Sequence, residues 1–466
     1  MSSSEITCPV SVRAAANPEL LFAIVDGDKL SYRLFDDRVR AVTAELSVSG
    51  IRPGDRVAFR LPNCIDAIAV IWACFRLRAI ACPISNRMPD SSYDKIVAAL
   101  EAHEPGLASN AHAAPTEQAT LDDAATATLI LSSGSTGMPK VIAHQLRAHL
   151  ASARASNANI PLSQCDRWLL SLPLYHVGGL AIVFRCIEAG AAVVIDSRNA
   201  GLREQIEFNA ITHVSMVSTQ LKRLLQGPAD LPKSLNAVLL GGGSMPFNLV
   251  KDAVHRGVPL YATYGLSEMG SQVTTTNLLV DSVVDASGTP ICFHSGRSIH
   301  GAELRFGRDG EILVRGSSLM QGYWYDGGPK SAVDIDGWFH TKDLGALDAD
   351  GNLVVHGRAD NMFTSGGENI HPEEIEARLL ELRGVRQAVV VAIPDAEYDA
   401  RPIAFIDAVE RNGWDEDLFR AELQTSLAKF KIPDRFLSWP DELSQFGVKP
   451  RRRDFEKIAI AAVRRS

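Results

Sequence analysis

Apolar runs alternate with amphipathic stretches over roughly the first 285 residues of the chain. Residues with apolar side chains at every third or fourth position predict helices, for example at 66–77 and 218–226. Runs rich in β-branched and aliphatic residues predict strands at 56–61, 128–133, 191–195, 212–218 and 236–242. Because these strands are apolar on both faces, we expect a parallel or mixed sheet covered by helices, in an α/β fold of layered sheets and helices.

The pattern changes after about residue 285. Strand-like runs at 303–316 and 345–357 contain the turn sequences R-D-G and A-D-G, which are typical of hairpins. We therefore expect a small β-rich subdomain at about 285–359, at the end of an N-terminal domain that covers 1–359.

A third pattern begins at residue 360. A strand is predicted at 385–394, and helices are predicted at 371–384, at 414–430 and from about Arg453 onward. This combination predicts a small, mobile α+β C-terminal domain over 360–466, joined to the body by a short polar junction.

Composition narrows the class of protein. The chain has 466 residues, is 46% apolar and 22% charged, and has a net charge of −8, values usual for a soluble enzyme and unlike a nucleic-acid-binding protein. The N-terminus does not resemble a signal peptide, and every long apolar run is interrupted by charge, so we expect no membrane insertion. The 7 cysteines show no C-x-x-C spacing, and Cys74 and Cys186 lie in apolar runs where we expect burial. These features favour a reducing cytoplasm.

The segment LILSSGSTGMPKVIAH (129–144) is the most informative in the chain. An apolar strand leads into a turn of small residues and hydroxyls, and a lysine follows. Glycines let backbone N–H groups approach phosphate oxygens, and hydroxyls and a lysine add donors and positive charge. It is not a Walker loop, because Met138 and Pro139 separate the last glycine from the lysine. A serine-rich surface turn remains the alternative for this segment taken alone. The candidate phosphate-binding residues are Ser132, Ser133, Gly134, Ser135, Thr136, Gly137 and Lys140.

This loop is followed by three further motifs in an order that resembles the acyl-adenylate-forming enzymes, which include acyl- and aryl-CoA ligases, luciferases and nonribosomal adenylation domains. The motifs are YGLSEMG (264–270), GWFHTKDLG (337–345) and GRADNMFTSGGENIHPEEIE (357–376). The resemblance implies activation of a carboxylic acid by ATP and Mg²⁺, followed by transfer of the acyl group to coenzyme A.

Within this family, four segments are similar to those of the ligases that act on 2-succinylbenzoate in menaquinone biosynthesis. They are WLLSLPLYHVGG (168–179), THVSMVSTQLKRLL (212–225), AVLLGGGSMP (237–246) and FGVKPRRRDF (446–455). Another aryl- or fatty-acid–CoA ligase, or a stand-alone enzyme that loads a carrier protein, remains open as an alternative. The oligomeric state is also left open, a homodimer being one option.

The resemblance implies a set of nucleotide-binding residues. Glu268 would bind Mg²⁺, while Asp343 would accept hydrogen bonds from the ribose hydroxyls with support from Arg358. Tyr264 would stack on adenine in a pocket lined by Gly241, Gly242 and Gly265. A core tyrosine and a turn aspartate are the structural alternatives for Tyr264 and Asp343.

The C-terminal domain would supply the remaining catalytic groups. Lys449 would stabilise the negative charge that develops during adenylation, with a solvated basic tail as the alternative. Asp360 would be the hinge between two poses of the domain, or an ordinary turn residue. One pose would bring Lys449 to ATP, and the other would bring Gly366 and Gly367 towards the pantetheine channel.

Arg185 is the main clue to the acid. It interrupts an apolar run, and a buried charge there requires a partner. That partner is either Glu188, one helical turn away, or a second carboxylate on the substrate. Ser215, Thr219 and Gln272 are further candidate contacts to the acid. His176 is placed between the acyl pocket and the thiol channel, with a satisfied core histidine as the alternative.

Overall fold

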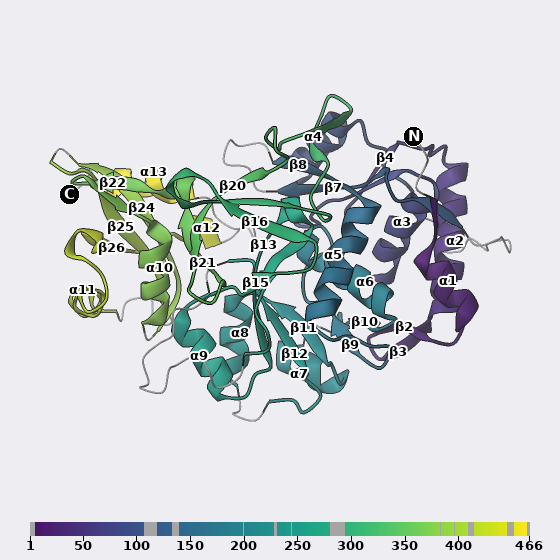
Figure 1. The fold of residues 1–466 in the computed structure, drawn as a ribbon, viewed down its shortest axis with the longest axis horizontal. Coiled ribbons are helices and arrows are strands. Elements are labelled where there is room, and N and C mark those ends of the chain that lie inside the picture. The colour runs from purple at the N-terminus through teal and green to yellow at the C-terminus, as the bar shows by residue number, and fades with distance from the viewer. Residues whose placement is uncertain are drawn as a thin grey trace.

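Two large sheets form the body of the molecule in the computed structural model, and a smaller C-terminal module lies beside them (Figure 1). The structure describes residues 5–106, 119–132, 139–198, 200–227, 231–243, 245–279, 294–382, 384–395, 397–408, 414–444 and 452–463.

The first sheet has nine strands and is mostly parallel at its centre, as the apolar runs predict. In spatial order it contains β15 (Arg297–Ser298), β14 (Ser271–Thr275), β13 (Leu260–Leu266), β12 (Ala237–Leu240), β11 (His213–Met216), β9 (Arg167–Leu169), β10 (Ala192–Ile195), β2 (Leu21–Val25) and β3 (Asp28–Ser31).

The second sheet has six strands and is parallel at one end and antiparallel at the other. It contains β19 (Gly328–Lys330), β18 (Gly322–Tyr325), β8 (Lys140–Gln145), β7 (Thr126–Ser132), β5 (Ile80–Pro83) and β4 (Arg56–Phe59). A short pair, β1 (Glu5–Thr7) and β6 (Thr120–Asp122), lies near the N-terminus.

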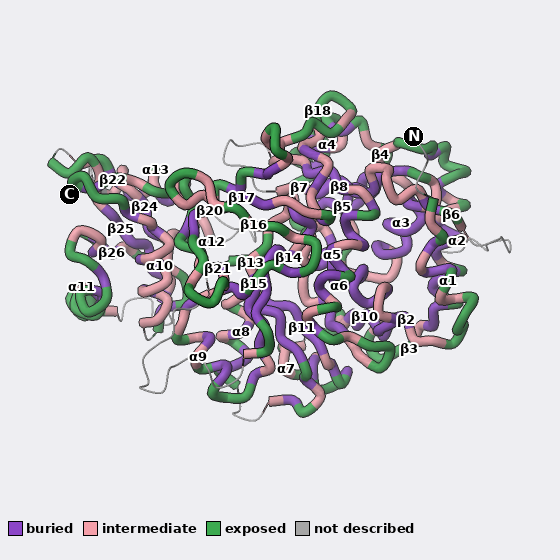
Figure 2. The backbone as a smooth tube through the Cα atoms, viewed as in Figure 1, coloured by how far each residue is buried: buried purple, intermediate pink, exposed green. Residues whose placement is uncertain are grey.

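Helices fill the space between the two sheets and cover the outer face of the first. Successive residues of β10 point to opposite faces of the first sheet. Val193 packs with the inner helices, which lie between the two sheets, and Val194 packs with the outer helices on the other face. The inner helices are mostly buried (Figure 2). The inner group and its neighbours are α1 (Pro9–Ala16), α2 (Tyr32–Val48), α3 (Ile65–Arg76), α5 (Leu146–Asn159) and α6 (Val177–Ala189); the outer group is α7 (Leu202–Phe208), α8 (Ser218–Leu225) and α9 (Phe247–His255); α4 (Asp90–Leu100) packs on the second sheet. Cys74 and Cys186 are buried here, as predicted.

An antiparallel four-stranded sheet follows the body, in agreement with the predicted hairpins. Its strands are β16 (Ala302–Phe306), β17 (Glu311–Gly316), β20 (Phe339–Leu347) and β21 (Leu353–Arg358). A 3-10 turn at Ala359–Asn361 then leads into the C-terminal module.

The C-terminal module has an α+β composition and hydrophobic clusters of its own. It contains β22 (Phe363–Ser365), β23 (Glu368–Ile370), β24 (Val385–Asp395), β25 (Asp399–Ala408), β26 (Arg435–Ser438), α10 (Pro372–Glu381), α11 (Glu416–Gln424), α12 (Asp441–Ser444) and α13 (Arg452–Val463). The α/β fold class with a small α+β module is thus confirmed, while the division at 359/360 stays our proposal.

Several predicted boundaries differ from the structure by a few residues, as two helices of the C-terminal module illustrate. The helix expected at 414–430 is capped by Asp415 and ends at Gln424, and the chain then forms a 3-10 turn at Lys429–Lys431. The last helix begins at Arg452, one residue earlier than expected. In the described part of the chain, no helix combines the length and the apolar character needed to cross a membrane.

Candidate active site

The parallel strands β11, β12 and β13 end at one edge of the nine-stranded sheet, where ligands commonly bind in open α/β sheets. Gly241 directly follows β12, and a Cβ atom at this position would lie 2.6 Å from Thr263 Cγ2. A Cβ at Gly265 would lie 2.0 Å from the Ser271 carbonyl oxygen. These two glycines are therefore required by the close approach of neighbouring strands, and Gly242 by its positive φ of 79°.

Tyr264 and Asp343 come from different sheets and meet at this edge. The Tyr264 hydroxyl donates to Asp343 Oδ2 over 2.6 Å, and Arg358 Nη1 donates to Asp343 Oδ1 over 3.2 Å. Arg358 is also the cross-strand partner of Asp343 in the β20–β21 pair. The predicted adenine and ribose residues are thus in contact with each other.

Burial governs the electrostatics of this pair. It raises the pKa of the Asp343 carboxyl, against the lowering effects of the Tyr264 hydrogen bond and the Arg358 charge. Burial, followed by the neighbouring Asp343 charge, raises the pKa of the Tyr264 phenol. Tyr264 therefore stays protonated and can donate at any physiological pH.

The two ends of the glycine-rich loop lie side by side, because Ser132 and Lys140 face each other in the β7–β8 hairpin. The loop residues between them, with the predicted contacts Ser133, Gly134, Ser135, Thr136 and Gly137, lie outside the described residues.

Lys140 is joined to Glu268 through a residue that the sequence analysis missed, Tyr323 of β18. Lys140 Nζ donates to the Tyr323 hydroxyl over 3.4 Å and lies 4.7 Å from its ring centroid. The Tyr323 hydroxyl in turn donates to Glu268 Oε1 over 2.8 Å. Tyr323 lies 183 positions from Lys140 in sequence, and its only signal was an aromatic strand pattern, GYWY.

Glu268 fits the role of a Mg²⁺ ligand. It lies in a short 3-10 turn directly after β13, and its Oε2 has no hydrogen-bond partner among the described residues. Mg²⁺ is usually held by one or two carboxylates together with water and the phosphates of a substrate. A single carboxylate beside the candidate phosphate-binding loop is compatible with such a site.

Arg185 lies on α6 with only 1% of its surface exposed. Its Nη2 donates to Ser271 Oγ over 2.9 Å and to Gln272 Oε1 over 3.1 Å, and its guanidinium lies 5.2 Å from the Trp168 ring. Among the residues with described positions, its buried Nε has no hydrogen-bond partner. Burial lowers the pKa of Arg185 to about 10, so the side chain is still charged at neutral pH.

The alternative in which Arg185 pairs with Glu188 is wrong. Glu188 instead accepts a hydrogen bond from Arg154 Nε over 2.9 Å, at a partly exposed position on the side of α5. In the described parts of the chain, no carboxylate forms an ion pair with Arg185.

The other predicted acid contacts are only partly brought together. Ser215 is buried, and its Oγ accepts from Trp168 Nε1 over 3.2 Å, so Ser215 and Arg185 contact the same indole. Thr219 is exposed on α8, and no contact joins it to Arg185 in the described structure. His176 is exposed at the N-terminus of α6, with its ring 4.7 Å from that of Tyr175. The alternative of a satisfied core histidine is therefore wrong.

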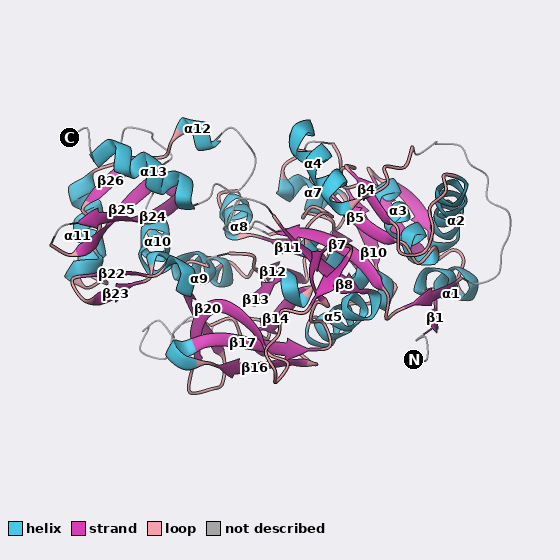
Figure 3. Ribbon diagram, turned by 90° about the horizontal axis from the view of Figure 1, so that it is seen from above, coloured by secondary structure: helices cyan, strands magenta, loops and turns pink. Residues whose placement is uncertain are grey.

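The predicted hinge residue Asp360 lies in a charged cluster. Its carboxylate is 3.2 Å from Lys342 Nζ and 3.4 Å from Arg358 Nη2, so Arg358 contacts Asp343 and Asp360 at once. Gly366 and Gly367 form the turn between β22 and β23. In Figures 1 and 3, β22 lies in the C-terminal module, far from β7. Lys449 lies outside the described residues.

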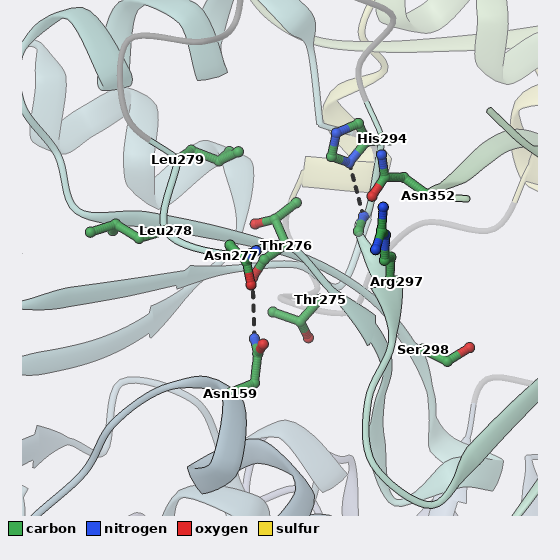
Figure 4. A pocket seen from close by; sticks show the side chains of 11 residues that line it. Asn159, Thr275, Thr276, Asn277, Leu278, Leu279, His294, Arg297, Ser298 and Asn352 are labelled. Carbon is green, nitrogen blue, oxygen red and sulfur yellow. Dashed lines mark hydrogen bonds between the residues drawn. The ribbon is translucent and has the colours of Figure 1, made fainter. Parts of the chain in front are cut away.

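A polar cavity of about 370 Å³ lies beyond the carboxyl end of α5, against β14 and β15 (Figure 4). None of the predicted site residues that the structure describes lines it. Thr275, which accepts from Gln272 Nε2 over 2.7 Å, connects its wall to the neighbours of Arg185. The cavity therefore lies beside the neighbours of Arg185, and it is not lined by the candidate nucleotide-binding residues that the structure describes.

Known proteins of similar sequence and structure point to one family. The family model for AMP-binding enzymes matches residues 10–104 and 92–324. The 2-succinylbenzoate–CoA ligase of Salmonella typhimurium is 34% identical over 446 residues, with 93% of each chain covered. The o-succinylbenzoate CoA synthetase of Bacillus subtilis, solved with the acyl-adenylate intermediate OSB-AMP, superposes with a TM-score of 0.84 at 26% identity, covering 96% of this chain and 99% of that one.

A second structure of the Bacillus subtilis enzyme, in complex with ATP and a magnesium ion, also superposes with a TM-score of 0.84, at 27% identity and with coverages of 94% and 96%. A family match over more than half of the chain, together with relatives that align along nearly its whole length, leaves one conclusion. The chain belongs to the AMP-binding enzyme family.

Proposed function

We propose that this protein is a 2-succinylbenzoate–CoA ligase of menaquinone biosynthesis. In the first step, a substrate carboxylate oxygen attacks the α-phosphorus of ATP, and pyrophosphate leaves. In the second step, the thiol of coenzyme A attacks the acyl carbon, the C–S bond forms, and AMP leaves as the C–O bond breaks. The full-length similarity to ligases of this name supports the reaction class.

The observation that supports the substrate assignment is that Arg185 is buried with only neutral hydrogen-bond partners among the described residues. A buried guanidinium with neutral partners is costly, because its desolvation is not offset by an opposite charge. A substrate with two carboxylates can have one adenylated while the other supplies the missing partner of Arg185. A monocarboxylic acid would leave this cation unpaired.

The nucleotide-binding side would use the contacts described above. Glu268 would hold Mg²⁺, which neutralises phosphate charge when bound. Tyr323 would fix the positions of the Lys140 and Glu268 side chains relative to each other. Asp343 would accept from the ribose hydroxyls, with Tyr264 beside the adenine. Thr136 and its neighbours in the loop, together with Lys449, would contact the phosphates.

The thioester-forming step would use the other face of the acyl site. His176, exposed at the start of α6, would lie where the thiol enters. Gly366 and Gly367 would approach that channel only after the C-terminal module rotates about Asp360. The adenylate already carries a good leaving group, so a strong general base is not required.

Turnover with ATP and coenzyme A tests this function. We expect 2-succinylbenzoate to give AMP, pyrophosphate and thioester, with kcat/KM at least about 100-fold above benzoate and octanoate, since one buried ion pair supplies several kcal/mol. Preference for a monoacid would overturn the substrate assignment. Omitting coenzyme A should leave only adenylate formation, and transfer to a carrier protein in place of coenzyme A would point to a loading enzyme.

We further propose that the enzyme works in the cytoplasm and forms a homodimer. Sedimentation equilibrium of the purified protein would test the assembly, and a monomeric mass at micromolar concentration would contradict it.

A further inference from the structure

Arg452, the first residue of α13, inserts between α10 and β24 of the C-terminal module. Its Nη1 lies 2.5 Å from Glu376 Oε1 and also donates to the Val390 carbonyl, while its Nη2 lies 3.3 Å from Glu373 Oε1. Glu376 is only 9% exposed and also accepts from the Val390 backbone N–H over 2.7 Å. One guanidinium therefore joins three elements at a largely buried position.

Glu373 connects this cluster to the proposed hinge. The oxygen that faces Arg452 also accepts from Asn361 Nδ2 over 2.5 Å, and Asn361 directly follows Asp360. The other oxygen packs against Gly357, where a Cβ atom would lie 2.8 Å away. The start of α13 and the residues on both sides of Asp360 thus share a single carboxylate.

Chain connectivity gives this cluster its functional meaning. Lys449 precedes Arg452 by three residues, so their Cα atoms can be separated by at most about 11 Å. Arg452 therefore limits, through three residues of chain, how far Lys449 can lie from the start of α13, and Glu373 links that start to Asn361 and Gly357. Arg452 itself makes its contacts within the C-terminal module.

We propose that Arg452 is a positioning residue for adenylation, which ties the start of α13, three residues after Lys449, to the hinge through Glu373 and Glu376. This inference rests on the proposed function and on the role given to Lys449. On the proposed function, adenylation needs the lysine at the ATP phosphates, whereas thioester formation uses a different pose. Arg452 should therefore matter for the first step and much less for the second.

The test compares R452Q and R452K with the matched control R453Q, which removes the neighbouring charge at an exposed position of the same helix. The first step is followed as 2-succinylbenzoate-dependent exchange of pyrophosphate into ATP. The second step is followed as conversion of chemically prepared acyl-adenylate and coenzyme A to thioester. The double variant K449A/R452Q completes the set.

We expect R452Q to lower the kcat of exchange by about a hundredfold, as small displacements of a catalytic group do, with KM for ATP within threefold of wild type. R452K should recover part of this loss, R453Q should match wild type, and thioester formation should stay within threefold throughout. The double variant should be no slower in exchange than K449A alone, since both changes remove the same contribution.

Equal losses in both steps, or losses of R452Q and K449A that multiply, would show that Arg452 serves only the fold of the module. If R452Q does not fold, it will also lose thioester formation. In that case the test rests on R452K, which should be slower than wild type in exchange and within threefold of wild type in thioester formation. Failure of the proposed function looks different, because the wild-type protein itself would show no exchange dependent on 2-succinylbenzoate.

Discussion

Replacement of Arg185 by methionine separates the effect of its buried charge on stability from the effect of that charge on substrate recognition. Methionine is similar in length and apolar, so it can fill the space beside Trp168 without a charge. Removing one partner from a desolvated ion pair costs about 2–5 kcal/mol, which corresponds to a loss of about 30- to 4000-fold in kcat/KM for 2-succinylbenzoate.

The effect on stability should be small. Burial lowers the pKa of Arg185 to about 10, a shift that corresponds to about 3 kcal/mol against the charged form in the folded protein. This penalty is present in full below pH about 10, and it shrinks as the pH rises from there towards the ordinary arginine pKa of the unfolded chain. Losing the hydrogen bonds to Ser271 and Gln272 costs about 1.5–3 kcal/mol each, so relief of the burial penalty offsets at least about half of that loss.

The assay uses two monocarboxylic analogues of the substrate beside the diacid. One, 4-oxo-4-phenylbutanoate, lacks the ring carboxylate, and the other, 2-butanoylbenzoate, lacks the chain carboxylate. We expect Arg185→Met to abolish the preference for the diacid, while kcat/KM for whichever analogue is turned over changes by less than about threefold. Thermal unfolding should give a Tm within about 5 °C of wild type.

Two results would refute this reasoning. If kcat/KM falls equally for the diacid and the analogue, Arg185 does not recognise the second carboxylate. If Tm falls by more than about 10 °C, the Arg185 hydrogen bonds stabilise the fold by more than its burial costs.

Four further predictions concern the nucleotide-binding residues. Tyr323→Phe removes a hydrogen bond to a carboxylate worth about 1.5–3 kcal/mol, so pyrophosphate exchange should fall by about 10- to 150-fold; an unchanged rate would mean that Tyr323 does not position Glu268. Glu268→Gln should raise the Mg²⁺ concentration needed for half-maximal exchange by at least about tenfold, measured by titration at fixed ATP. Lys449→Ala should lower exchange by about 100- to 1000-fold while supplied acyl-adenylate is still converted to thioester, and full exchange would remove the lysine from the mechanism. Because burial raises the pKa of Asp343, the KM for ATP should rise as the pH falls, beginning above the ordinary aspartate value of about 3.9, and Asp343→Asn should remove this dependence.

Local patterns predicted most of the fold. The strands at 191–195 and 236–242 were recognisable because continuously apolar runs of this length suit a sheet covered on both faces. The helix expected at 414–430 was too long, because its apolar periodicity continues through Leu427 and Phe430, which pack on the core of the module from beyond the end of the α-helix. Tertiary packing determined where that helix ends.

The site was predictable only where its residues belong to recognisable motifs. The contact between Tyr264 and Asp343 joins two motifs, and both residues were named from sequence. Tyr323 was missed because it lies in a strand without a motif, and its importance depends on the pairing of β18 with β8. Spacing along α6 allowed Glu188 as a partner for Arg185, but only the packing of α5 shows that Glu188 faces Arg154.

The shared guanidinium of Arg358 has a thermodynamic consequence. Arg358 contacts both Asp343, the carboxylate assigned to the ribose, and Asp360, the carboxylate assigned to the hinge. A change at either carboxylate therefore alters the free energy of the contact at the other. Coupling of this kind is reciprocal: whatever factor nucleotide occupancy applies to the equilibrium between module orientations, orientation applies equally to nucleotide affinity. Rotation of the C-terminal module towards the thioester-forming pose would then change the affinity for AMP by the same factor. Arg358 would thereby couple the release of AMP to the orientation of the module.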